Sequence, residues 1–165
     1  MRPESAVKAY IGLGSNLEMP DRQLAGALEA LAGLPGTRVE AVSAFYRTAP
    51  IGFAGQPDFV NAVARIETLL AARDLLDRLL AIEREHGRVR EHLNGPRTLD
   101  LDLLLYGDHE LLEDGLTVPH PRMHQRAFVM VPLAELAPAL DIQGRGRADD
   151  LAASLSLTQR IERLR

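Results

Sequence analysis

The hydrophobic and polar positions alternate with two periods, which together predict strands and helices in the order βαββαβ. Leucines recur at helical spacing after Pro20, and a second leucine stripe runs from Asp74 to His86, so both segments are expected to be amphipathic helices. Apolar, β-prone runs bounded by turn residues predict the strands. These runs are Val7–Leu13, Val39–Tyr46, Phe59–Ile66 and Leu99–Tyr106.

Two more helices are expected in the C-terminal third. One covers Arg126–Leu136 despite Pro132, and an amphipathic helix covers Leu151–Leu164 behind a Gly-Arg-Gly-Arg turn. Helices between non-adjacent strands, with a hairpin-like pair in the middle, predict an α+β fold with a ferredoxin-like core, in which helices pack on a mainly antiparallel sheet. Because no linker, repeat or low-complexity segment interrupts the pattern, we expect residues 1–165 to form a single domain.

The composition narrows the class of protein. With 165 residues, 46% hydrophobic and 25% charged, the chain has the balance of an ordinary globular protein. The absence of cysteine excludes disulfides, zinc-thiolate sites and a thiol nucleophile. A net charge of -4 argues against nucleic acid or a membrane surface as partner. Neither a signal peptide nor a membrane-spanning run is apparent, so a cytoplasmic protein is expected. We also expect a monomer without an obligate protein partner.

The strongest local signal is Asp100-Leu101-Asp102 in the last predicted strand. Residues two apart in a strand project from the same face, so both carboxylates point one way and Leu99, Leu101 and Leu103 the other. One interpretation is a strand surface that faces solvent. The other is a site for a divalent cation, since Mg²⁺ typically takes one or two carboxylates together with substrate phosphates.

Basic residues surround this acidic pair, although the chain as a whole is acidic. No Asp or Glu occurs between Gly115 and Val131. Arg84 is interpreted as solvating a helix end, but the others favour a polyphosphate held by metal and arginines. The basic residues concerned are Arg84, Arg88, Arg90 and Arg97 before the pair and His120, Arg122, His124 and Arg126 after it.

The glycines near the N-terminus do not form a known phosphate-binding motif. Gly12-Leu13-Gly14-Ser15-Asn16-Leu17 lacks the third glycine of a dinucleotide fingerprint, and no P-loop pattern occurs. We interpret this segment as a structural turn after the first strand, with Asn16 bonding a nearby loop.

Asn61 stands within an apolar strand pattern. It is either an exposed strand position or an amide that reads the edge of a planar heterocycle, with Phe59 or Phe128 stacking on the face of the ring.

Six ordered segments over about residues 7–140 resemble the 6-hydroxymethyl-7,8-dihydropterin pyrophosphokinase family. The most specific is Gly95-Pro96-Arg97-Thr98-Leu99-Asp100-Leu101-Asp102-Leu103-Leu104-Leu105-Tyr106-Gly107. The others are the segments Ile11–Leu17, Phe45–Gly52, Gln56–Ala62, Glu83 with Gly87–Arg90, and Thr117–Arg122.

The resemblance implies a ferredoxin-like fold and transfer of pyrophosphate from ATP to the hydroxymethyl oxygen of the pterin, with release of AMP. It implies that Asp100 and Asp102 bind two Mg²⁺ ions, and that Arg88 and Arg97 share in catalysis. It further implies an ATP site formed by Glu83, Arg88, Arg90, Arg97, His120 and Arg126, and a pterin site formed by Thr48, Pro50, Phe59, Asn61 and Phe128.

Four positions depart from the family pattern: Asn94 replaces a frequent tryptophan, Phe59 a tyrosine, Leu80 a glutamine and Ala49 a proline. None of them changes the carboxylates. Two alternative functions remain open from the residues themselves. One is another magnesium-dependent phosphotransfer or phosphodiester enzyme that needs no pterin. The other is a non-catalytic binding module in which Asp100 and Asp102 are surface residues.

Overall fold

The computed structural model describes residues 3–49, 57–87 and 98–164. No helix within these ranges is both long and apolar enough to cross a membrane. The elements are β1 Val7–Ser15, α1 Pro20–Ala32, β2 Thr37–Val42, β3 Tyr46–Thr48, β4 Phe59–Thr68, α2 Ala72–Gly87, β5 Leu99–Tyr106, β6 Leu111–Glu113, β7 Leu116–Val118, a short 3₁₀ helix Met123–Gln125, α3 Ala127–Leu136, β8 Asp141–Ile142, β9 Gly146–Arg147, α4 Ala148–Ser156 and β10 Glu162–Arg163.

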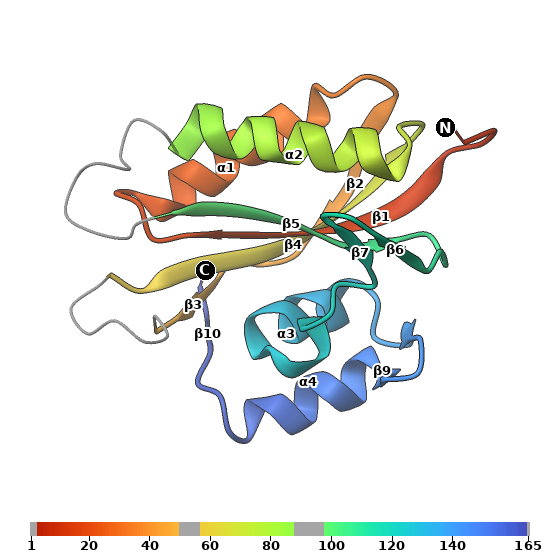
Figure 1. Cartoon of the computed structure of the whole chain (residues 1–165). Helices are drawn as coiled ribbons and strands as arrows, with labels where there is room; N and C mark the ends of the chain where they lie inside the picture. Colours follow the sequence, from red (N-terminus) through yellow and green to blue (C-terminus); the bar gives the residue numbers. More distant parts are fainter. Residues whose placement is uncertain (1–2, 50–56, 88–97, 165) are drawn as a thin grey trace.

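The main sheet has the order β10-β3-β4-β1-β5, with β2 also paired to β4. All of its pairings are antiparallel. Helices α1 and α2 cover one face, and α3 and α4 lie on the other (Figure 1). This arrangement confirms the predicted α+β ferredoxin-like core, with β2 and β3 together occupying the place of one strand.

Each face of the sheet has its own hydrophobic core. Leucines of α1 and α2 pack against Ile11, Leu101 and Ile66 on the first face. On the second face, Met130 and Leu133 of α3 form a cluster with residues of the sheet. These sheet residues are Tyr10, Val63, Leu104 and Leu105. Because strand side chains alternate, the same strands supply both cores.

The expected strand Val39–Tyr46 is wrong, because β2 and β3 are separate. Ser43 breaks the ladder: its Oγ accepts a hydrogen bond from the Val63 N–H at 3.0 Å. The next N–H, that of Ala44, donates to the Glu135 carboxylate at 2.9 Å. Side chains thus satisfy backbone groups that a continuous strand would pair, and the chain bends toward α3.

The C-terminal helix is also shorter than expected. Helix α4 ends at Ser156, and Glu162–Arg163 forms β10 on the edge of β3. The expected Leu151–Leu164 helix is therefore wrong beyond Ser156. The edge of β3 offers unpaired backbone groups, and residues Glu162–Arg163 pair with it instead of continuing the helix.

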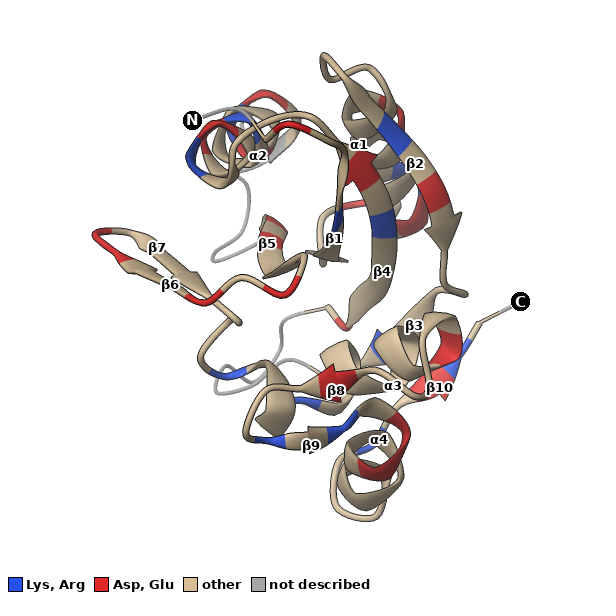
Figure 2. Cartoon of the chain, turned by 90° about the vertical axis from the view of Figure 1, so that its right-hand side faces the viewer, with Lys and Arg blue, Asp and Glu red and all other residues tan. Residues whose placement is uncertain are grey.

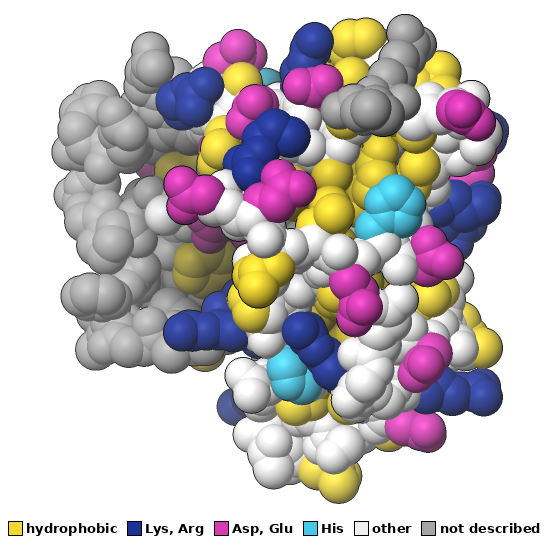
Figure 3. All heavy atoms as spheres, turned by 45° about the vertical axis from the view of Figure 1, so that its right-hand side comes forward, with side chains coloured by type: hydrophobic (Ala, Val, Ile, Leu, Met, Phe, Trp, Pro, Cys, Tyr) yellow, Lys and Arg dark blue, Asp and Glu magenta, His cyan; other side chains and the backbone are white. Residues whose placement is uncertain are grey.

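Charged side chains of both signs are distributed over the elements rather than segregated. Figure 2 shows acidic and basic positions on the same strands, notably β2 and β4. In the face shown in Figure 3, acidic and basic side chains are likewise interspersed with hydrophobic atoms. A pocket on the α3 side of the sheet, in contrast, is lined by several polar and charged side chains.

Candidate active site

A pocket of about 270 Å³ opens on the α3 side of β4, β1 and β5. Its floor is β1, the strand between the other two. Gly14 pairs with Asn61 of β4 on one side and with Asp100 of β5 on the other. Gly12 pairs with Asp102. The residues that line the pocket are Gly12, Leu13, Gly14, Thr48, Ala49, Phe59, Asn61, Ala62, Asp100, Asp102, Arg126, Phe128 and Val129.

The two glycines are what leave room for this pocket. A Cβ atom on Gly14 would lie 2.8 Å from Asn61 Oδ1, whereas one on Gly12 would lie 3.5 Å from the Leu104 side chain. The interpretation of Gly12–Asn16 as a turn is therefore wrong, since β1 continues to Ser15. Sequence reasoning missed both residues, although two glycines at alternate positions of a strand are a signal for close approach of a ligand.

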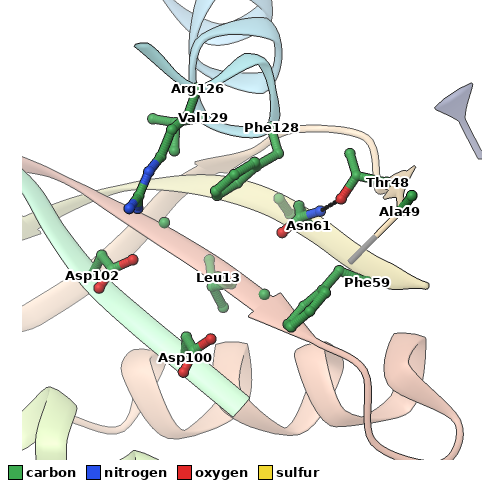
Figure 4. Close-up of a pocket in the computed structure, with 13 residues that line it drawn as sticks. Leu13, Thr48, Ala49, Phe59, Asn61, Asp100, Asp102, Arg126, Phe128 and Val129 are labelled. Carbon is green, nitrogen blue, oxygen red and sulfur yellow. Dashed lines mark hydrogen bonds between the residues drawn. The ribbon is translucent and has the colours of Figure 1, made fainter. Parts of the chain in front are cut away.

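Asp100 and Asp102 project from β5 into the pocket (Figure 4). Leu99, Leu101 and Leu103 are buried on the opposite side, as the strand period predicted. Desolvation raises the pKa of both carboxyl groups. For Asp100 a hydrogen bond from the Thr98 hydroxyl opposes this rise, and the charge of Asp102 adds to it. Two carboxylates held together with raised pKa values form a site that a cation would stabilise.

Arg126 is the cation that faces this acidic pair. Its guanidinium points toward Asp102 in Figure 4, and its charge lowers the pKa of both carboxyl groups against the effect of burial. The Arg126 guanidinium carbon also lies 5.5 Å from the centre of the Phe128 ring, within the range of a cation–π contact. Arg126 thus connects the acidic end of the pocket with its aromatic end.

The other end of the pocket combines an amide with two phenylalanine rings. Asn61 is only 4% exposed, so the interpretation as an exposed strand position is wrong. Its Nδ2 donates to Thr48 Oγ1 at 2.8 Å, while Phe59 and Phe128 line the pocket on either side of it (Figure 4). This end is suited to a flat ligand with hydrogen-bonding groups on its edge.

Two of the expected ATP residues do not line the pocket. Glu83 lies on α2, and its Oε2 accepts a hydrogen bond from the Leu101 N–H of β5 at 2.7 Å. Burial raises the pKa of Glu83, and the charges of Asp100 and Asp102 add to the rise. Since β5 is an edge strand, this bond satisfies an outward N–H and ties the acidic strand to α2.

His120 lies on the outer side of the acidic strand. Its N–H donates to the Leu104 carbonyl of β5 at 2.9 Å, and its ring Nδ1 accepts from the Arg122 N–H at 3.2 Å. Burial lowers the pKa of His120, and the charges of Arg126, Arg145 and Arg122 lower it further. The structure therefore puts His120 among cations next to β5.

The expected roles of Pro50, Arg88, Arg90 and Arg97, and the departure at Asn94, lie outside the described residues. Just before β5, the Thr98 N–H donates a hydrogen bond to Asn16 Oδ1 at 2.9 Å. Asn16 thus anchors the start of β5, which confirms that it bonds a nearby loop.

The donors available for a metal are the two carboxylates. In the ranges that the structure describes, no three His, Cys, Asp or Glu residues come together in a way that could hold a metal ion. A cation bound to Asp100 and Asp102 would therefore need further oxygen ligands from water or substrate.

Comparison with known proteins adds three findings. Residues 10–138 match the model of the 7,8-dihydro-6-hydroxymethylpterin-pyrophosphokinase (HPPK) family. The chain is 50% identical over 157 residues to the 2-amino-4-hydroxy-6-hydroxymethyldihydropteridine pyrophosphokinase of Pseudomonas aeruginosa, covering 95% of this chain and 96% of the relative. It is 52% identical over 134 residues to the enzyme of the same name from Haemophilus influenzae, covering 81% of this chain and 84% of that one.

Among solved structures, the fold is similar to that of a Plasmodium falciparum HPPK-DHPS A437G chain. The TM-score is 0.74 at 12% sequence identity, over 93% of this chain. The present chain spans 46% of that longer protein. At this identity the likeness shows a shared fold.

Proposed function

Because the chain belongs to the 7,8-dihydro-6-hydroxymethylpterin-pyrophosphokinase family, we propose that its pocket is the active site of that family's reaction. The chain is a diphosphotransferase of folate biosynthesis, and ATP is the co-substrate of its family. The hydroxymethyl oxygen of the pterin attacks the β-phosphorus of ATP. The bond from that phosphorus to the oxygen bridging to the α-phosphorus breaks, the hydroxyl proton is released, and AMP leaves.

The observation that carries this assignment is the presence of both kinds of recognition group in one pocket. Asp100 and Asp102 lie at one end, and Asn61 lies between Phe59 and Phe128 at the other. A pterin is a flat heterocycle with donors and acceptors along its edge, so an amide and two rings match it chemically. The glycine floor supplies the depth that a ring needs.

Within the pterin end, each residue has a distinct part. The Thr48 hydroxyl accepts one N–H of Asn61 Nδ2 and so fixes the orientation of the amide, which leaves its other N–H and its carbonyl oxygen available to a ligand. We assign the stacking faces to Phe59 and Phe128. Pro50 belongs to the same proposed subsite.

The acidic end fits two Mg²⁺ ions. Carboxylate oxygens are the hard ligands that Mg²⁺ prefers, and the pKa values of Asp100 and Asp102, which burial raises, support a pair that a bound cation would stabilise in the ionised form. Asp100 and Asp102 would hold the ions, with the ATP phosphates as further ligands. Ions held there would supply neutralisation of phosphate charge and would favour ionisation of the attacking hydroxyl.

The basic residues complete the nucleotide end. Phosphoryl transfer is mostly positioning and charge neutralisation, so the part of Arg126 is to hold phosphate oxygens beside the acidic pair. His120 provides a donor next to β5. We assign Arg88, Arg90 and Arg97 to ATP binding as well, and Arg88 and Arg97 also to catalysis. Glu83 acts by holding Leu101 and hence β5 in place.

We also propose that residues 1–165 form a single domain, which works as a monomer in the cytoplasm. Its substrates are small molecules, and it binds neither nucleic acid nor a membrane. The support for a single domain is the antiparallel sheet that joins segments from both ends of the chain, from β1 to β10. Sedimentation at concentrations used for assay tests this part, and a dimer would contradict it.

The central test is a product assay with ATP, Mg²⁺ and 6-hydroxymethyl-7,8-dihydropterin. AMP and a pyrophosphorylated pterin are expected in equal amounts. Formation of ADP, or nucleotide cleavage that does not depend on the pterin, would overturn the assignment of the pocket.

A further inference from the structure

A hairpin in the C-terminal part of the chain bonds to the loops on the outer side of β5. Strands β8 and β9 pair through Ile142 and Gly146, and the Arg145 N–H donates to the Ile142 carbonyl at 2.7 Å. Gly144 and Gly146 have φ values of 70° and 127°, a region that favours glycine. Arg145 is therefore placed by two glycines at the tip of a tight turn.

Two hydrogen bonds attach this hairpin to the loops that follow β5 and β7. Arg145 Nη1 donates to the His120 carbonyl at 2.6 Å, and Gln143 Nε2 donates to the Asp108 carbonyl at 2.9 Å. In Figure 2 the β8–β9 hairpin lies beside the segment that leads from β7 to α3, and basic residues occur in both. The hairpin thus touches the chain on the outer side of the acidic strand.

His120 is held from both sides as a result. Its N–H bonds to Leu104, two residues after Asp102 on β5, and its carbonyl oxygen receives the guanidinium of Arg145. A hydrogen bond from a charged donor is stronger than one between neutral groups. Arg145 therefore clamps the His120 peptide against the strand that carries the acidic pair.

The ring of His120 has a defined hydrogen-bonding state. Its Nδ1 accepts from the Arg122 N–H, so in the neutral ring the proton is on Nε2, which is then a donor. The charged groups that act on the ring are Arg126, Arg145 and Arg122, and together with burial they lower its pKa. The bond to Nδ1 and the lowered pKa both favour the neutral ring with Nε2–H as a donor.

We propose that Arg145 is a positioning residue for the nucleotide: it holds the His120 backbone so that the Nε2–H of the ring is presented to the ATP phosphates. This inference rests on the proposed function and assigns that site a residue from the C-terminal hairpin. Arg145 acts through His120, whose carbonyl oxygen its guanidinium holds.

A purely structural role for Arg145 makes different predictions. As an anchor of the hairpin alone, it would affect unfolding without changing nucleotide affinity or the ring of His120. The positioning role predicts that both change, and that they change together. The matched control is Arg147, which belongs to the same hairpin but pairs with Asp149 at 2.8 Å.

The experiment compares Arg145→Met, Arg145→Lys and Arg147→Met with the wild type. Steady-state assays measure KM for ATP, KM for the pterin and kcat. NMR titration of the imidazole signals measures the pKa of His120, whose signal among the five histidines is assigned with a His120→Gln variant. Calorimetry with Mg²⁺ and α,β-methylene-ATP, whose reacting bond is blocked, measures binding without turnover.

For Arg145→Met we expect KM for ATP to rise about threefold to tenfold, as for loss of one charge-assisted hydrogen bond, with KM for the pterin unchanged. The pKa of His120 should rise, because one neighbouring positive charge is gone. Arg145→Lys should keep the low pKa and recover part of the ATP affinity. Arg147→Met should resemble the wild type in all three measurements.

Equal behaviour of Arg145→Met and Arg147→Met would overturn the proposal, as would a loss of stability with unchanged KM for ATP and unchanged His120 pKa. Failure of the proposed function is a separate outcome. If the wild type forms no AMP from ATP and the pterin, the reaction assignment fails, whereas the titration and the calorimetry still test the coupling of Arg145 to His120.

Discussion

On the α1–α2 side of the sheet, strands β1, β4 and β5 present apolar side chains along their whole length, among them Ile11, Ala64 and Leu101. On the α3 side, the same strands are apolar at one end only, where Tyr10 and Val63 pack. Toward the other end they carry two glycines, an amide and two carboxylates. One set of strands therefore builds a continuous core on one face and a pocket on the other.

The difference between the faces separates stability from function. Buried aliphatic side chains stabilise the fold through removal of apolar surface from water. The pocket face gives up such contacts at Gly12 and Gly14 and adds two neighbouring carboxyl groups with raised pKa values, which a bound cation would stabilise in the ionised form. The core on the α1–α2 face thus stabilises the strands, and the α3 face of the same strands can bind ligands.

The largest expected effect comes from removing a pocket carboxylate. Asp102→Ala should lower kcat for AMP formation by about 100-fold to 1000-fold, the cost of losing one preorganised electrostatic group. Pterin binding, measured by fluorescence titration, should stay nearly unchanged because Asn61 and the two rings lie at the other end. Asp108→Asn, at the exposed turn after the same strand, is the control. Turnover above a tenth of the wild type would remove Asp102 from the reaction.

The opposite face should respond in stability rather than activity. Leu79→Ala, on α2, where the side chain is fully buried in the core between α2 and the sheet, should lower the free energy of unfolding by about 2–5 kcal/mol. KM for both substrates, assayed at low temperature on the folded fraction, should not change. Urea unfolding checks the first value. A large change in KM with little loss of stability would erase the distinction between the two faces.

The glycine floor offers a matched pair with a smaller effect. Gly14→Ala should weaken pterin binding about tenfold, because its Cβ would approach Asn61 Oδ1 to 2.8 Å and disturb the bond to Thr48. Gly12→Ala should bind the pterin more tightly than Gly14→Ala does, since its Cβ meets Leu104 at an ordinary 3.5 Å. Calorimetric titration of both variants compares them. The reverse ranking would contradict the described packing of the floor.

The smallest expected effect is on the pH dependence of stability without Mg²⁺. The raised pKa of Asp102 means that, just above the ordinary value of 3.8, the folded chain holds more protons than the unfolded one. The free energy of unfolding therefore falls as pH rises through the native pKa. Asp102→Asn should remove this loss, so the variant should match the wild type below pH 3.8 and exceed it above the window. Urea midpoints measured across that range, with Asp108→Asn as control, test the sign, and a variant that becomes the less stable one above the window would refute it.

The local pattern predicted a good part of the candidate site. The common orientation of Asp100 and Asp102 follows from the strand period and is confirmed. The helix period predicted the stripe of α2, which is confirmed at Leu75, Leu79 and Ile82, whereas Leu80 of that stripe is exposed. The resemblance named Thr48, Phe59, Asn61, Arg126 and Phe128, and the structure brings all five into one pocket. Turn propensity, in contrast, misplaced Gly12 and Gly14, because pairing with strands on both sides outweighs the local preference.

The C-terminal segment shows why other parts of the fold and the site could not be predicted from the sequence. Its helical period predicted one helix to Leu164, yet β10 forms because the edge of β3 offers unpaired backbone groups. Arg145 gave no sequence signal for its bond to His120, since the two residues meet only when the β8–β9 hairpin folds against the loop that follows β7. The local sequence around β10 and around Arg145 therefore could not predict the pairing with β3 or the bond to His120.

By itself, the amino-acid sequence determined which residues alternate, where most of the long helices and strands form and which chemical groups the chain carries, because these depend on neighbours within a few positions. Only the tertiary structure decided which groups meet. It set Asn61 and Asp100 on either side of Gly14, although the three come from β4, β5 and β1. Pairing of distant strands costs chain entropy and is selected by the packing of the whole molecule, so the pocket is a property of the fold.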